Sequence, residues 1–215
     1  MMQLYNMLER LDIVCSVITA LSTVFIAAQL FQTACAEKKH HEEMRRIKTV
    51  EIMENWTKFL KKETSFAERI VEGFTDEQCR CLYFKEEFEL DCKKGQDICQ
   101  ICKENAFDVS HEQCDKCITG DKFKLAGAEL SEFRWYVVGY LNMLESVMTA
   151  WHLNIVDREE IEYQFQYLYN PERGWNALKP FRDAAGGRNA YPNIEKFIQE
   201  MERRRSKERP ERAKL

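Results

Sequence analysis

The residues best suited to chemistry in this 215-residue chain are four cysteines arranged as two Cys-x-x-Cys pairs, Cys99 with Cys102 and Cys114 with Cys117. Eleven residues separate the two pairs. Knuckles of this kind place four thiolates around one zinc ion, at about 2.3 Å each. Because four thiolates leave no open position for water, the predicted zinc site is structural and contributes to folding.

The same four cysteines also fit a disulfide framework or an iron–sulfur cluster. A cytoplasmic location keeps thiols reduced and therefore favours the metal over disulfides. Three further cysteines, Cys79, Cys81 and Cys92, lie upstream, and His111 lies between the two knuckles. They offer ligands for a second metal site, although Cys-x-Cys spacing is a weaker signal than Cys-x-x-Cys.

Catalytic motifs are absent from the sequence. The eight glycines are scattered and form no phosphate-binding loop, and the four histidines form no i, i+4 ligand pair. The acidic residues Glu159, Glu160 and Glu162 have the pattern of a solvated helix face. The sequence therefore predicts a protein that is not an enzyme.

A charge-free run of 24 residues, 13–36, precedes an otherwise highly charged chain. A helix needs about 20 apolar residues to cross a bilayer, so this run predicts one membrane-spanning helix. Two alternatives are a cleaved signal peptide ending near Ala34-Cys35-Ala36 and a buried soluble helix. The first is disfavoured because the segment before the run is not basic.

The charges that flank the run predict its orientation. Arg10 is the one basic residue before it, whereas Lys38, Lys39, Arg45 and Arg46 follow closely after it. Because positive residues stay on the cytoplasmic side, we expect the N-terminus to lie outside the membrane and the main domain in the cytoplasm.

Polar and small residues recur along the run at alternating steps of three and four. This seam consists of Asp12, Cys15, Thr19, Ser22, Ile26, Gln29 and Thr33. A 3.5-residue period is typical of helices that associate side by side, and lipid does not satisfy hydroxyls or amides. The seam predicts a homo-oligomer, either closed by small residues or open as a pore lined by these seven residues, with Ile26 as its constriction.

Basic residues suggest where a ligand binds. An oligomer would repeat four basic residues around its axis: Lys38, Lys39, Arg45 and Arg46. They are predicted to bind a polyanion, such as a nucleotide or an oligonucleotide. A cytoplasmic protein is the alternative partner. The net charge of −4 excludes a globally basic nucleic-acid binder. Residues 203–214 carry seven basic side chains and are expected to be disordered, with attraction to the inner leaflet or to nucleic acid as alternatives.

Helical periodicity dominates the remaining sequence, and the predicted fold is all-α: one membrane helix that continues into a cytoplasmic helical bundle with a zinc-knuckle insert. Residues 127–155 are apolar on nearly all sides, so they predict the central helix, and Asp157 with Glu160 predicts the start of the next one. The expected parts are an N-terminal segment and membrane helix at 1–36, juxtamembrane helices at 37–78, the cysteine-rich insert at 79–120, a helical bundle at 121–200 and a basic tail at 201–215.

A loose resemblance extends over most of the chain. The segments Gln29–Thr33 and Trp56–Leu60, together with the helix Phe133–Trp151, resemble a bacterial family of membrane-tethered helical proteins catalogued as a domain of unknown function. The layout is also similar to that of membrane effectors in antiphage systems of the Hailong type, which implies an oligomeric channel controlled by a nucleic-acid-like ligand. The alternative is a zinc-stabilised, membrane-anchored scaffold that recruits a cytoplasmic partner.

Overall fold

The computed structural model divides into two compact units, Met1–Ile47 and Lys48–Leu215. The backbone is described for residues 2–60, 62–91, 93–98, 118–119, 122–170 and 175–212. Side chains are described for residues 25–60, 64–65, 67–91, 93–98, 122–169 and 176–207.

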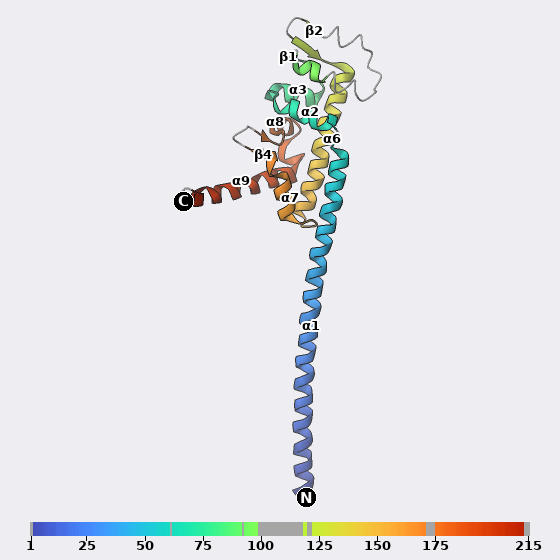
Figure 1. The fold of residues 1–215 in the computed structure, drawn as a ribbon, viewed down its shortest axis with the longest axis vertical. Helices are drawn as coiled ribbons and strands as arrows, with labels where there is room; N and C mark the ends of the chain where they lie inside the picture. The colour runs from blue at the N-terminus through green and yellow to red at the C-terminus, as the bar shows by residue number, and fades with distance from the viewer. Residues whose placement is uncertain are drawn as a thin grey trace. The chain divides into compact units, whose positions relative to one another are not determined.

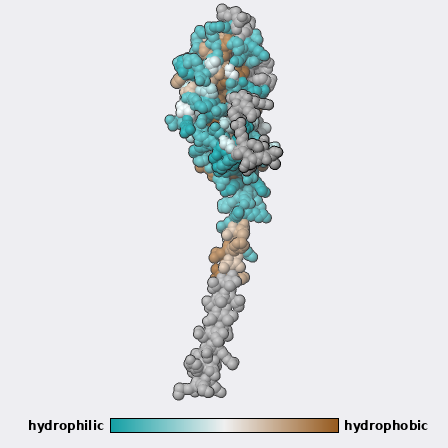
Figure 2. Space-filling model, turned by 90° about the vertical axis from the view of Figure 1, so that its left-hand side faces the viewer, coloured by the Kyte–Doolittle hydropathy of each residue, from teal (hydrophilic) through white to brown (hydrophobic). Residues whose placement is uncertain are grey.

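A continuous helix, α1 (Met2–Phe59), forms the first unit and enters the second (Figure 1). Its sequence contains no glycine or proline, so nothing interrupts its backbone hydrogen bonds. Figure 2 shows a brown, apolar band on the described part of α1. The large apolar side chains exposed there are Phe25, Ile26, Leu30 and Phe31.

The predicted membrane span lies only partly within the described side chains. Across the side chains that the structure describes, no helix combines the length and apolarity needed to cross a membrane. Residues 13–24 of the predicted span lie outside that part of the chain.

The second unit is mostly helical, as predicted. After α1 its elements are α2 (Lys62–Glu72), α3 (Asp76–Phe84), β1 (Phe88–Asp91), an unlabelled helix at 93–98, β2 (Ile118–Thr119), β3 (Lys122–Leu125), α6 (Gly127–His152), α7 (Arg158–Phe165), η1 (Gln166–Leu168), β4 (Tyr169–Asn170), β5 (Trp175–Asn176), α8 (Lys179–Ala184), η3 (Gly187–Asn189) and α9 (Pro192–Arg212). The predicted start of α7 is confirmed, because the Asp157 side chain accepts hydrogen bonds from the backbone N–H groups of Glu159 and Glu160.

Helix α6 is the centre of this unit, as its apolar sequence predicts. It contacts α2 and α9, and Figure 1 shows it beside the C-terminal turns of α1. Trp56 of α1 contacts two further helices. Its ring centroid lies 5.7 Å from that of Tyr140 in α6 and 5.1 Å from that of Phe165 in α7. At the far end of α6, the ring of Trp151 contacts that of Phe197 in α9, 5.2 Å away.

Two small antiparallel sheets, which the sequence analysis does not predict, accompany the helices of this mostly helical unit. Strands β1, β3 and β2 form one sheet in that order, and β4 pairs with β5 to form the other. In β1 and β3, buried and exposed side chains alternate, as in Phe88–Asp91. Four residues are too few for this alternation to stand out in a sequence. Close packing also constrains Gly95, where an added Cβ would lie 2.1 Å from the Phe123 ring of β3.

The C-terminal basic segment is helical, where the sequence predicts disorder. Helix α9 begins at Pro192 and continues to Arg212. Its first turn is held by Glu145 of α6, whose carboxylate accepts the backbone N–H groups of Asn193 at 2.9 Å and Ile194 at 3.0 Å. A tertiary contact therefore caps this helix, and local sequence does not reveal such a cap.

Candidate functional site

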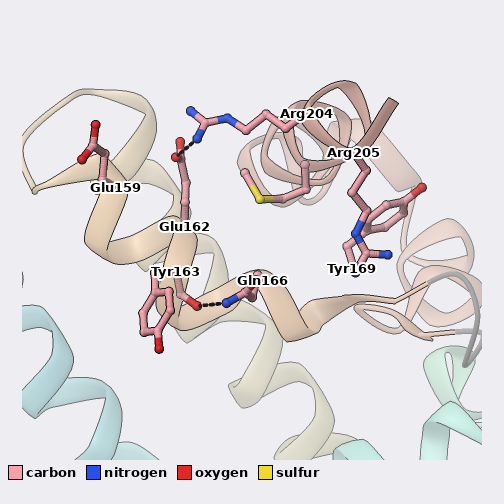
Figure 3. A pocket seen from close by; sticks show the side chains of 8 residues that line it. Glu159, Glu162, Tyr163, Gln166, Tyr169, Arg204 and Arg205 are labelled. Carbon is pink, nitrogen blue, oxygen red and sulfur yellow. Dashed lines mark hydrogen bonds and ion pairs between the residues drawn. The ribbon is translucent and has the colours of Figure 1, made fainter. Parts of the chain in front are cut away.

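A polar cavity of about 290 Å³ lies between α9 and the segment formed by α7, η1 and β4 (Figure 3). It is lined by Glu159, Glu162, Tyr163, Gln166, Tyr169, Met201, Arg204 and Arg205. Helix α7 supplies the acidic side and α9 the basic side. Helix α7 is anchored by the contact of Phe165 with Trp56 of α1, and α9 by the contact of Phe197 with Trp151 of α6, so the cavity is framed by elements that pack on one core.

Glu162 is the buried charged group among the residues that line this cavity, with only 5% of the residue exposed. One of its oxygens accepts the indole N–H of Trp151 at 2.9 Å, and the other lies 2.6 Å from the Arg204 guanidinium. Arg158 covers the Trp151 ring from the side, with its guanidinium carbon 4.4 Å from the ring centroid. A buried carboxylate needs such donors, because an unpaired charge away from water is strongly destabilising.

The arginines of α9 differ in how they are held. Arg204 is fixed between Glu162 and Glu200, with its Nε 3.1 Å from a Glu200 oxygen. A hydrogen bond from Arg203 is the main reason that the pKa of Glu200 falls to about 2. Arg205 instead lies over the ring of Tyr169, 5.7 Å from its centroid, and no carboxylate among the described side chains pairs with it.

This arrangement suits the binding of an anionic group. The ion pairs of Glu162 hold the wall rigid, while Arg205 presents a guanidinium on an aromatic face at the rim. A guanidinium fork is well matched to a carboxylate or a phosphate oxygen pair. The cavity can therefore take a small anionic group.

A second cluster of perturbed groups lies where α2, α6 and η1 meet. Burial, and next the charge of Glu72, raise the pKa of Glu68 to about 7. Burial likewise raises the pKa of Glu72, whose carboxylate accepts the backbone N–H of Leu178 at 3.1 Å, and it raises the pKa of Tyr167 to about 12. The buried Tyr140 hydroxyl shares a hydrogen bond with Tyr167. None of these groups lines either of two cavities that the described side chains form.

The predicted zinc ligands, Cys99, Cys102, Cys114 and Cys117, all lie outside the described residues. Within the described side chains, no group of three or more histidine, cysteine or acidic residues is placed to hold a metal ion. Of the second predicted set, Cys92 and His111 also lie outside, and Cys79 and Cys81 are buried thiols. Burial raises the pKa of Cys79 to about 12, which favours its protonated form.

The predicted pore-lining residues divide at the boundary of the described side chains. Asp12, Cys15, Thr19 and Ser22 lie outside it, whereas Ile26, Gln29 and Thr33 are described and exposed. The Thr33 hydroxyl donates to the Gln29 carbonyl oxygen at 2.9 Å, so it is satisfied within its own helix.

The predicted ligand residues lie on α1, where Lys38, Lys39 and Arg46 are exposed and Arg45 is half-buried. Lys38 and Arg45 are seven residues apart, as are Lys39 and Arg46. In a helix this spacing places each pair on one side, about 10 Å apart along the axis. The four residues, called the basic strip below, thus form two pairs that lie about 100° apart around α1.

Sequence reasoning missed the α7–α9 cavity. Glu162, expected on a solvated face, is buried, and the basic segment that supplies Arg204 and Arg205 is helical. One signal was available, because Glu162 follows the apolar Ile161 and precedes Phe165 on the buried side of α7. No family model, curated protein or solved structure matches the chain.

Proposed function

We propose that this chain is a single-pass membrane protein whose copies assemble through α1 into a pore controlled by the helical domain. The observation that carries the proposal is the exposure of large apolar side chains on α1. Phe25, Ile26, Leu30 and Phe31 are 56–71% exposed. Each side chain of this size is stabilised by about 1.5–3 kcal/mol when it leaves water. A lipid phase or neighbouring helices would supply that stabilisation.

The proposed topology has the N-terminus outside the bacterial inner membrane and the second unit in the cytoplasm. It is supported by the charge-free run 13–36, which continues from these exposed residues, and by the basic residues that follow it. The unbroken backbone of α1 supports mechanical coupling, since no glycine or proline separates the predicted span from Phe59.

In the proposed pore, the seam of α1 faces the axis, and Ile26 forms a constriction that excludes water when closed. An anionic ligand, such as a nucleotide or oligonucleotide, or a partner protein binds the basic strip. Its binding changes whether the constriction at Ile26 is open or closed. A zinc ion held by the Cys99–Cys117 knuckles stabilises the insert. The similarity in layout to antiphage membrane effectors suggests defence as the setting.

Ion flux through vesicles that contain the purified full-length protein tests the pore. Ile26→Ser in every copy should wet the constriction and give constitutive flux, whereas Phe25→Ser, one position off the seam, should not. Arg45→Ala with Arg46→Ala should change the response to a polyanion and leave assembly intact. An oligomer that passes no current, with or without Ile26→Ser, would contradict the pore.

One observation favours a second candidate, a membrane-anchored scaffold that recruits a cytoplasmic protein. The Thr33 hydroxyl bonds back to the carbonyl of Gln29, so it does not need water or a neighbouring helix. If the other seam hydroxyls also bond within their own helix, neighbouring copies of α1 can pack tightly against one another through the small seam residues and leave no pore. A silent Ile26→Ser variant in an assembled protein would support the scaffold.

A further inference from the structure

The second unit has an apolar groove of about 500 Å³ between the end of α1 and α7. It is lined by Thr49, Val50, Met53, Glu54, Thr57 and Lys58 of α1, and by Glu160 and Gln164 of α7. Val50 is part of the α1 wall and is 60% exposed. The groove is thus a largely apolar surface that α1 and α7 leave uncovered.

The groove lies beside the face of α1 that packs on the core. Thr49 and Trp56 are buried on that face, and the Thr49 hydroxyl accepts the backbone N–H of Asp157 at 2.7 Å. At 100° per residue, Val50 and Thr57 lie about 80–100° from Thr49 around the helix. Packing of α1 on the bundle therefore leaves this second face uncovered.

Residues of the uncovered face recur with the same 3.5-residue period as the seam of the proposed oligomer. Counted along the sequence from Ile26, Gln29 and Thr33 in alternating steps of three and four, the series reaches Val50, Glu54 and Thr57. These are three of the residues that line the groove. A seam with this period keeps facing its partner as long as the helices supercoil.

The inference rests on the proposed function at one point: copies anchored in one membrane with the same orientation run parallel. Equivalent residues of neighbouring copies then lie at the same height, so the segment of a neighbour that reaches the groove is its own residues 48–58. We propose that a second copy of this chain occupies the groove with this part of α1. The assembly thus continues past the membrane into the second unit.

Charge complementarity supports this occupant. Glu160, on the α7 wall, has no basic partner among the described residues, and its carboxylate accepts only the Gln164 amide there, at 2.9 Å. Lys58, which flanks the seam, is 72% exposed. In a parallel arrangement the Lys58 of a neighbour lies beside Met53, which suits its aliphatic stem, with its ammonium near Glu54 and Glu160.

Glu54 would also set the register. It is the charged residue among the last four positions of this series, Ile47, Val50, Glu54 and Thr57, and within its own helix it pairs with Lys58 at 3.4 Å. A shift by one step would place the Glu54 carboxylate against the Val50 side chain of the neighbour. A polar residue at one seam position commonly selects a single register in this way.

Photo-crosslinking of the full-length protein in membranes tests the proposal. A photoreactive residue is placed singly at Val50 or Thr57, and the matched control is Asn55, which is exposed on the same turns but lies about 140–160° away from them around α1. We expect covalent dimers and higher species from Val50 and Thr57, with a yield at least fivefold above that from Asn55. Val50→Asp should reduce crosslinking from Thr57 by a similar factor, and Asn55→Asp should not.

A photoreactive residue at Thr33 separates this proposal from the function it rests on. Crosslinks from Thr33 but not from Val50 or Thr57 would overturn the groove contact and leave the oligomer standing. Absence of crosslinks from all three positions would overturn both. Equal yields from Val50, Thr57 and Asn55 would indicate random collision and would also overturn the groove contact.

Discussion

Replacement of Glu162 tests whether the α7–α9 cavity is built around a buried carboxylate. Glu162→Leu removes the acceptor of the Trp151 indole N–H, and Trp151 is only 2% exposed. A buried donor without a partner costs about 1–3 kcal/mol. Glu162→Gln keeps an acceptor and loses the ion pairs to Arg204 and Arg158, whose side chains are 46% and 42% exposed. A half-exposed pair of this kind is worth about 1 kcal/mol or less.

Thermal unfolding of the full-length protein in detergent, followed by tryptophan fluorescence, measures the difference. We expect the melting temperature of Glu162→Leu to lie about 2–12 °C below that of Glu162→Gln, since 1 kcal/mol shifts Tm by about 2–4 °C at this chain length. Glu159→Gln, an exposed change on the same helix, should leave Tm nearly unchanged. Equal melting temperatures for the leucine and glutamine variants would refute the buried hydrogen bond.

Three further predictions concern other parts of the chain. Burial raises the pKa of Glu68 from an ordinary 4.5 to about 7. The contribution of protonated Glu68 to stability is therefore complete below about pH 4.5 and is lost as the pH rises through about 7. Between pH 5 and 8, the measured Tm should fall more in the wild type than in Glu68→Gln. Arg182 is fully buried, donates to two backbone carbonyls and pairs with Glu195. Arg182→Met should therefore lower the free energy of unfolding by about 3–5 kcal/mol. Adding Glu195→Gln to this variant should restore part of the loss. Metal analysis should find about one zinc per chain, and Cys102→Ser with Cys114→Ser should abolish it; full retention of zinc would refute the predicted ligands.

Local sequence patterns were sufficient for most of the helices. The absence of glycine and proline predicts an unbroken α1, the apolar character of residues 127–155 predicts a central α6, and Asp157 predicts the start of α7. These features depend on hydrogen bonds and periodicities within a few residues, and such interactions can be counted along a chain.

The small sheets and the C-terminal helix were not predictable in this way. Strands β1 and β3 are stabilised by pairing with each other across more than thirty residues of sequence, as in Phe88 opposite Leu125. Helix α9 gains its N-terminal cap from Glu145, 48 residues upstream of Asn193. Neither partner is visible in the local sequence of the element that it stabilises.

The candidate sites also differ in whether local sequence patterns or tertiary contacts define them. The cysteine knuckles and the seam of α1 are predictions that need no tertiary structure, because ligand spacing and a 3.5-residue period are properties of the chain alone. The folded structure was needed to find that Glu162 is a buried carboxylate paired with Arg204, and that Val50 is exposed in a groove beside α7. A helical period says which residues share a face, but what packs on that face depends on contacts between distant segments, which the period does not contain.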